Sequence, residues 1–264
     1  MMSMPTLFGQ EITSGFILGA YTVSIGTACL VLLLELLLWD EEWKQQFAQP
    51  NIRELYWSGV RTSLLNYLLL APAAKGLATA WVASQAAYNN AAVGLAGLLA
   101  CQAVGYGFAH AWMHLPDNYR WTGHKFHHRF NDKTFVRPIS ANAVTWIEFA
   151  AAYAIPLMAG ILLFRPTPLV ADLVILSVSL ANLCIHTPEK VLSMRGAPAL
   201  LVTNKKHFHH HQVDAAKFFS APILDLDSVL GLRDRVNPRH QSDVQKDEKG
   251  GGRWHGNGGN SNDG

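Results

Sequence analysis

Charged residues are scarce in this chain. Asp, Glu, Lys and Arg make up 15% of its 264 residues, whereas a soluble domain usually carries about 25%. Half of the residues are hydrophobic and the formal net charge is only +2. This composition excludes a disordered chain and gives no support to nucleic-acid binding through a basic surface. It also makes an ordinary soluble enzyme a poor interpretation.

Cysteine is scarce as well. The three cysteines, Cys29, Cys101 and Cys184, lie in separate apolar runs, too far apart for a CxxC metal or redox site. An odd number of cysteines provides no disulfide framework, which excludes a small disulfide-stapled secreted domain. We therefore expect all three to be reduced residues packed in the interior.

Long apolar runs are what the chain has instead. About 20 apolar residues span a bilayer, so the runs predict four to five transmembrane helices in an all-α, multi-pass membrane bundle. The second run contains Pro72 and Lys75, which leaves a kinked or re-entrant segment open there. We expect Lys75 and the other charge inside a run, Glu35, to reach toward the membrane surface near helix ends. The five runs cover residues 16–39, 63–87, 91–113, 143–164 and 169–185.

Basic residues are distributed unevenly between these runs. Most Lys and Arg residues fall in segments 40–62, 115–142 and 188–264, whereas the N-terminus and the two intervening turns together hold Arg165 alone. The positive-inside rule then places the N-terminus outside and the basic segments, with the C-terminus, in the cytosol. We expect a multi-pass protein of the endoplasmic reticulum membrane in a eukaryote, or of the inner membrane in a bacterium.

Histidine is unusually frequent, and nine of the 12 histidines form three clusters. These read HAWMH at 110–114, HKFHH at 124–128 and HFHHH at 207–211. Positions i, i+3 and i+4 of a helix share one face, so each HxxHH pattern can offer imidazoles to two neighbouring metal ions. His209 is out of this register and is expected to face elsewhere. We expect the clusters to lie on a cytosolic helical cap at the end of the bundle.

The number and kind of these side chains indicate a transition-metal pair. Imidazoles without a cysteine ligand suit first-row transition metals, and eight or so exceed the four ligands of a structural zinc site. His186 stands apart at the end of the fifth run, with Asn182 one helical turn before it. His240 and His255 fall outside any pattern and are expected not to be ligands.

The three clusters, in this order between apolar runs, resemble the fatty acid hydroxylase/sterol desaturase superfamily over roughly residues 95–235. NLCIH at 182–186 is similar to the intermediate histidine of that family, and LDLDSVLGL at 224–232 resembles its closing segment. Glu148 stands where the family often has a glutamate after the second cluster. The resemblance implies nine iron ligands: His110, His114, His124, His127, His128, His186, His207, His210 and His211.

The residues around these ligands show departures from the family pattern. Gln102 replaces the acidic residue common about two turns before the first cluster, and Ala111 replaces an arginine. In the closing segment, Leu230 and Leu232 replace phenylalanine and threonine.

Four residues are expected to support the ligands. Helical position alone makes Gln102, Tyr106 and Asn182 candidates for contact with them. Glu148 is expected either to orient a ligand or to be a carboxylate at the membrane interface.

The resemblance implies an O2-dependent oxidoreductase with two iron ions, which hydroxylates or desaturates a sterol or fatty acyl lipid. Zinc is an expected alternative metal in isolated protein. Electrons from NAD(P)H are expected through a separate donor, either a cytochrome b-type haem protein with its reductase or a ferredoxin. No catalytic residue is expected beyond the metal ligands. The alternative is a non-catalytic membrane metal-binding or carrier protein, whose ligands should follow a path near the midplane.

The chain divides into three expected regions. Residues 1–90 form an N-terminal transmembrane region, 91–240 a histidine-box catalytic domain, and 241–264 a Gly- and Asn-rich tail predicted to be disordered. Small residues on the later apolar helices are expected to leave room for a substrate. They are Gly94, Gly97, Gly105, Gly107 and Gly160.

Overall fold

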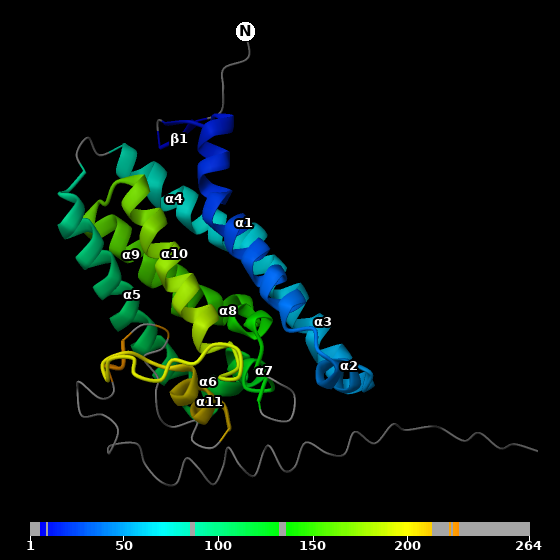
Figure 1. Cartoon of the computed structure of the whole chain (residues 1–264). Helices are drawn as coiled ribbons and strands as arrows, with labels where there is room; N and C mark the ends of the chain where they lie inside the picture. The colour runs from blue at the N-terminus through cyan, green and yellow to red at the C-terminus, as the bar shows by residue number, and fades with distance from the viewer. Residues whose placement is uncertain are drawn as a thin grey trace, which may run out of the picture.

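The computed structural model describes residues 6–8, 10–84, 88–131, 136–212, 222 and 224–226. The expectations for the 241–264 tail, for His240 and His255 and for Leu230 and Leu232 lie outside these residues. The described chain is a helical bundle with one short hairpin, β1 (Thr6–Leu7) paired with β2 (Gln10–Glu11) (Figure 1). The expected all-α, multi-pass architecture is confirmed.

Among the described residues, four helical stretches are long and apolar enough to cross a membrane, which meets the lower of the two expected numbers. Their outward faces carry many exposed leucines; Leu36 is 71% exposed and Leu163 is 68% exposed. Side chains of this kind suit contact with lipid. The four stretches are α1 (Ser14–Leu37), α5 (Ala91–Met113), the continuous run α8 (Trp146–Phe149), η3 (Ala150–Ala154) and α9 (Ile155–Phe164), and α10 (Pro168–Ile185).

The second apolar run continues a longer helical stretch. After the short helix α2 (Glu41–Phe47), the chain runs through α3 (Pro50–Leu65), the π-helical turn η1 (Asn66–Leu70) and α4 (Ala71–Ala83). This stretch packs beside α1 (Figure 1). The expected irregularity is therefore a π-helical turn in the middle of the stretch. The stretch itself is not among the four candidate spans.

Both π-helical turns end just before a proline, Pro72 after η1 and Pro156 after η3. Proline has no N–H, and its ring crowds the carbonyl four residues earlier, so a wider turn accommodates it. For Pro156 that carbonyl belongs to Ala152, which is buried and accepts a hydrogen bond from Gln102 Nε2 at 3.2 Å. Gln102 thus satisfies a backbone group inside the bundle and ties α5 to η3.

The glycines of α5 and α9 bring these helices into close contact. A Cβ atom added at Gly97 would lie 2.2 Å from the Phe164 ring, and one at Gly105 would lie 2.7 Å from Pro156. The expectation that small residues leave room for a substrate is wrong at Gly94, Gly97, Gly105 and Gly160, where an added Cβ would lie 3.1 Å or less from a neighbouring atom. Neighbouring side chains fill the space, as in other close pairs of membrane helices.

The two charges predicted to reach the membrane surface are instead buried and paired. Arg137 donates from Nε to Glu35 Oε2 at 2.8 Å and from Nη1 to the Leu38 carbonyl at 3.1 Å. Lys75 pairs with Asp172 of α10 and donates to the Gly19 carbonyl of α1. Since the lipid interior offers no water to a charge, each is retained by an opposite charge on another segment.

The three cysteines are free, as expected, but they are not in the core. Cys29 is exposed, and Cys101 and Cys184 are partly exposed. An apolar residue on the outer side of a bundle helix faces lipid rather than the protein interior.

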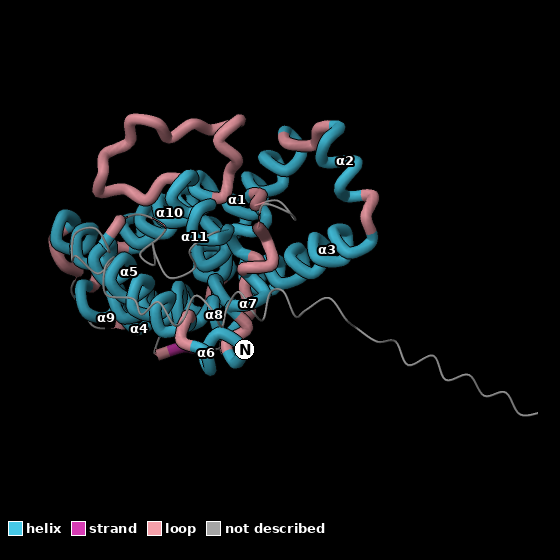
Figure 2. The backbone as a smooth tube through the Cα atoms, turned by 90° about the horizontal axis from the view of Figure 1, so that it is seen from below, coloured by secondary structure: helices cyan, strands magenta, loops and turns pink. Residues whose placement is uncertain are grey.

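Short elements form a cap at one end of the bundle (Figure 1). Seen from that end, α11 lies close to the end of α10 (Figure 2), on which it packs. The cap elements are α6 (Pro116–Trp121), α7 (His124–His127), the 3-10 turn η2 (Pro138–Asn142) and α11 (Asn204–Gln212).

Candidate metal centre

The histidine clusters converge from four separate segments at the capped end of the bundle. The contributing segments are the end of α5, helix α7, the end of α10 and helix α11. All nine side chains predicted as ligands are buried, with at most 6% of their surface exposed, whereas His209 is exposed. Their potential ligand atoms form two groups, His110, His114, His124, His128 and His210 in the first, and His127, His186, His207 and His211 in the second.

The two HxxHH motifs are divided between these groups in opposite ways. In the α7 motif the first and last histidines, His124 and His128, join the first group, and His127 joins the second. In the α11 motif only His210 joins the first group. An α-helix turns about 100° per residue, so positions i and i+4 point within about 40° of each other while i+3 points away from i+4. Each motif therefore contributes to both groups.

Within each group the Nε2 atoms face one another at short range. In the first group, His124 Nε2 lies 2.9 Å from His114 Nε2 and 3.1 Å from His110 Nε2. In the second, His207 Nε2 lies 2.9 Å from His186 Nε2 and 3.1 Å from His211 Nε2. Two nitrogens bound to one ion at about 2.1 Å and at right angles would be about 3.0 Å apart. The spacing fits a bound transition-metal ion in each group.

Hydrogen bonds between imidazoles do not account for this arrangement. His124 Nδ1 lies 2.7 Å from Glu148 Oε1, and an ionised carboxylate only accepts, so Nδ1 of a neutral ring carries the hydrogen. His124 Nε2 then presents a lone pair to three other Nε2 atoms, those of His110, His114 and His128. One lone pair cannot receive three hydrogens, whereas a cation at the common centre attracts all four nitrogens.

Burial lowers the pKa of six of these imidazoles and so favours their neutral form, which is the form that binds metals. Burial lowers the pKa of His186 to about 4. Burial and the neighbouring imidazoles hold the pKa of His128 and of His211 well below the ordinary value. At neutral pH the lone pairs are thus available without loss of a proton.

Two acceptors fix the orientation of ligand rings. Glu148, buried in α8, holds His124 as described, and the Asn182 carbonyl lies 2.8 Å from His186 Nδ1. Of the two sequence-based interpretations of Glu148, the contact with His124 fits the orienting one. Acceptors next to metal-binding histidines usually act in this way: they fix the tautomer and the orientation of the ring.

The other three candidates for ligand contact are placed differently from one another. Tyr106 packs edge-on against His110, with ring centroids 5.3 Å apart. Asn182 meets His186 through its backbone, while its side-chain Nδ2 donates to the Ala141 carbonyl at 2.7 Å. Gln102 lies two turns from His110 and bonds the Ala152 carbonyl instead.

Sequence reasoning missed the turn that positions α7. Gly123 has a φ of +76°, and a Cβ there would lie 2.4 Å from Thr145 Cγ2. Thr145 donates to the Thr122 carbonyl and caps α8 by accepting from the Glu148 amide. The turn before His124 and the start of the helix that carries Glu148 are therefore built together. A glycine directly before the second cluster was the available signal.

Helix α11 is held in place by two anchors. Asn204 Nδ2 donates to the Thr187 carbonyl at 3.1 Å, next to His186. Lys206 Nζ lies 2.8 Å from Asp225 Oδ2, and Asp225 is fully buried. The start of the predicted closing segment thus fixes the helix that carries the third cluster.

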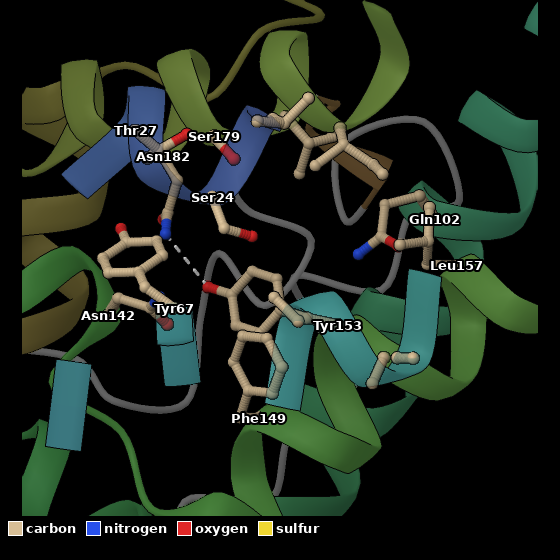
Figure 3. A pocket seen from close by; sticks show the side chains of 16 residues that line it. Ser24, Thr27, Tyr67, Gln102, Asn142, Phe149, Tyr153, Leu157, Ser179 and Asn182 are labelled. Atoms are coloured by element: carbon tan, nitrogen blue, oxygen red, sulfur yellow. Dashed lines mark hydrogen bonds between the residues drawn. The ribbon is translucent and has the colours of Figure 1, made fainter. Parts of the chain in front are cut away.

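A partly open cavity of about 80 Å³ lies among the helices, bordered mainly by apolar side chains of the spanning helices (Figure 3). Tyr153 and Asn182 line it and are hydrogen-bonded to each other. The Tyr153 ring contacts Tyr106, which contacts His110 of the first histidine group. Asn182 contacts His186 of the second. The cavity wall is therefore connected to both groups.

Comparison with known proteins agrees with this geometry. The family model for fatty acid hydroxylase matches residues 94–231, a segment that includes all nine buried histidines and more than half of the chain. Neither the comparison with curated proteins nor that with solved structures finds a significant match. The chain belongs to the fatty acid hydroxylase family.

Proposed function

We propose that this protein is a membrane di-iron oxygenase that hydroxylates or desaturates a lipid, sterol or fatty acyl, with O2 and electrons that originate from NAD(P)H. One observation carries the proposal: two adjacent buried imidazole groups lie just beyond the wall of a mainly apolar cavity in a bundle of apolar helices, and Tyr106 and Asn182 connect them to it. Family membership supports an oxidoreductase of this type. Imidazole ligands suit iron and also zinc, so zinc can replace iron in isolated protein.

The nine buried histidines would hold the metal pair. Iron held by these residues would supply the activation of O2 and the cleavage of an unactivated C–H bond. Glu148 keeps the His124 ring in place, and the Asn182 carbonyl does the same for His186. The surrounding helices exclude water, so the site is dry when the substrate is in place.

A lipid substrate would reach the cavity directly from the bilayer. The cavity is bordered by side chains of α1, α5 and α10, all of which are candidate spans. Each apolar CH2 that stays out of water avoids a hydration cost of about 0.8 kcal/mol. A polar metabolite gains nothing from such a path.

We further propose that the capped end faces the cytosol and that a separate haem or ferredoxin protein delivers the electrons there. The basic segments of the chain support this orientation by the positive-inside rule. The position of the histidines also argues against a carrier. Helices α7 and α11, which carry two of the clusters, lie at one end of the bundle (Figure 1), and the other histidines group with theirs.

Metal analysis tests the site. The protein purified in detergent should hold two metal ions per chain. His127→Ala removes a ligand of the second group and His210→Ala removes one of the first, so each should lower the metal content and abolish turnover. His209→Ala is the matched control, since His209 lies exposed on the same helix. Full metal content in both ligand variants would refute the assignment.

Turnover tests the reaction. Membranes containing the protein are supplied with O2, NADPH, a donor system and labelled sterols and fatty acyl lipids, and products are identified by mass spectrometry. An oxidised or desaturated lipid that depends on His127 and His210 supports the proposal. Two bound metals without any lipid product would instead favour the metal-binding or carrier alternative.

A further inference from the structure

The hydroxyl group of Thr27 lacks the bond that helical threonines make elsewhere in this bundle. Thr22, on the same helix, donates to the Leu18 carbonyl at 2.8 Å, and Thr79 donates to the Lys75 carbonyl at 2.8 Å. Thr27 is only 2% exposed, yet its Oγ1 has no hydrogen-bond partner in the described chain. A buried hydroxyl without a partner is costly and points to a group that is bound there.

Asn182 presents a second such atom. Its Nδ2 donates to the Ala141 carbonyl and to the Tyr153 hydroxyl. Because a carbonyl can only accept, this contact fixes which side of the amide is the nitrogen. The other side, Oδ1, is a buried acceptor that no group of the described chain satisfies.

Both atoms belong to residues that line the cavity, Thr27 from α1 and Asn182 from α10 (Figure 3). Asn182 Oδ1 needs a hydrogen-bond donor from the ligand, whereas the Thr27 hydroxyl can give or receive a hydrogen bond. A hydrocarbon chain satisfies neither of them. An ester or ketone oxygen could accept from Thr27 but could not donate to Asn182 Oδ1, whereas a hydroxyl group can do both.

The cavity wall also argues for a neutral group. None of the described residues that line it is charged. A carboxylate or phosphate buried there would lack a compensating cation, and an unpaired buried charge is far more costly than a neutral hydroxyl. Fatty acids and phospholipid headgroups are therefore poor occupants of this end of the cavity.

We propose that Thr27 and Asn182 form a binding subsite for the hydroxyl group of a membrane alcohol, such as a sterol or a long-chain alcohol. This rests on the proposed function, since it assumes that the cavity holds the lipid substrate. Asn182 lies one helical turn before His186 and bonds it. Thr27 and Asn182 are thus specificity-determining residues that set how the lipid lies relative to the metal groups.

Equilibrium binding of labelled lipids tests the subsite without any turnover. The metal-loaded protein in detergent is titrated with cholesterol and with cholest-5-ene, which lacks only the hydroxyl, and separately with 1-octadecanol and octadecane. The variants are Thr27→Val, which removes the hydroxyl at nearly constant shape, Thr27→Ser, which keeps it, and Thr22→Val, which alters an exposed threonine of the same helix.

In at least one pair the alcohol should bind about 10-fold more tightly than its hydrocarbon, and the pair that responds identifies a sterol or a fatty alcohol. Thr27→Val should remove most of this difference, while Thr27→Ser and Thr22→Val retain it. The melting temperature of the lipid-free Thr27→Val protein should not fall, because its hydroxyl makes no bond there.

Equal binding of alcohol and hydrocarbon in both pairs, or a preference that survives Thr27→Val, would overturn the subsite. Absence of measurable binding by every lipid would overturn it as well. Because no reductant is supplied, no turnover occurs, and these outcomes are separate from the proposed reaction. Loss of alcohol preference in a protein that still oxidises a lipid leaves the oxygenase standing and removes only the subsite.

Discussion

Replacement of Glu148 by glutamine should weaken one of the two metal groups and spare the other. The carboxylate contacts His124 Nδ1 at 2.7 Å, and 4% or less of either side chain is exposed. His124 belongs to the first group, whereas the second group draws on other histidines. The substitution therefore perturbs a single centre through one ring.

The size of the effect follows from the bond that is lost. A hydrogen bond to a charged group contributes about 1.5–3 kcal/mol and a neutral one about 0.5–1.5 kcal/mol, so Glu148→Gln should cost about 1–2 kcal/mol. Glu148 Oε2 has no hydrogen-bond partner among the described residues, so the new amide group would also lack an acceptor. Since a tenfold change in affinity is about 1.4 kcal/mol, a cost of about 1–2 kcal/mol lowers metal affinity about 5- to 30-fold. The unpaired amide lowers it further, toward the loss of about 10–100-fold that usually follows removal of an orienting group.

Chelator titration with metal analysis measures this directly. Glu148→Gln should release one of its two ions at a free chelator concentration about 10–100-fold lower than the wild-type protein requires. The other ion should leave at the same concentration as in the wild type. Glu189→Gln serves as the control, because Glu189 pairs with Arg195 at an exposed site, where an ion pair contributes little. Parallel loss of both ions, or a release curve like that of the wild type, would refute the reasoning.

Three other predictions follow from the fold. Gly123→Ala should lower the melting temperature clearly more than Gly196→Ala: both glycines have positive φ, which costs about 1 kcal/mol, but only at Gly123 does a Cβ collide with Thr145, and equal shifts would contradict this. Loss of either member of the buried Glu35–Arg137 pair should destabilise the protein by about 3–5 kcal/mol. The double variant Glu35→Leu/Arg137→Met should regain much of that stability in thermal melting. Losses that simply add in the double variant would argue against the pairing. The metal-free protein should lose stability as pH falls from about 6.5 to about 4. Unfolded histidine takes up protons in this range, while folded His186, with a pKa of about 4, does not. His186 alone should account for a loss of about 3 kcal/mol, and a melting temperature that stays constant over this range would refute the prediction.

The sequence alone determined the helices and the chemistry of the site. Hydropathy located the third span at 91–113, where α5 runs from Ala91 to Met113, because an apolar run of that length has a single stable form in a bilayer. The spacing of HxxHH determined that each motif contributes imidazoles to both buried groups, since helical geometry fixes the direction of neighbouring side chains. These are local properties, and local patterns are sufficient to predict them.

Only the tertiary structure decided which residues meet. His210 joins the group of His110 because α11 packs across the end of the bundle, and nothing in the motif specifies that choice. Glu35 finds Arg137 across 102 positions. Gln102, which the pattern placed near the ligands, bonds the carbonyl that Pro156 leaves without an N–H. Each contact joins segments far apart in the chain, so its formation depends on how the helices pack and not on the sequence near either residue.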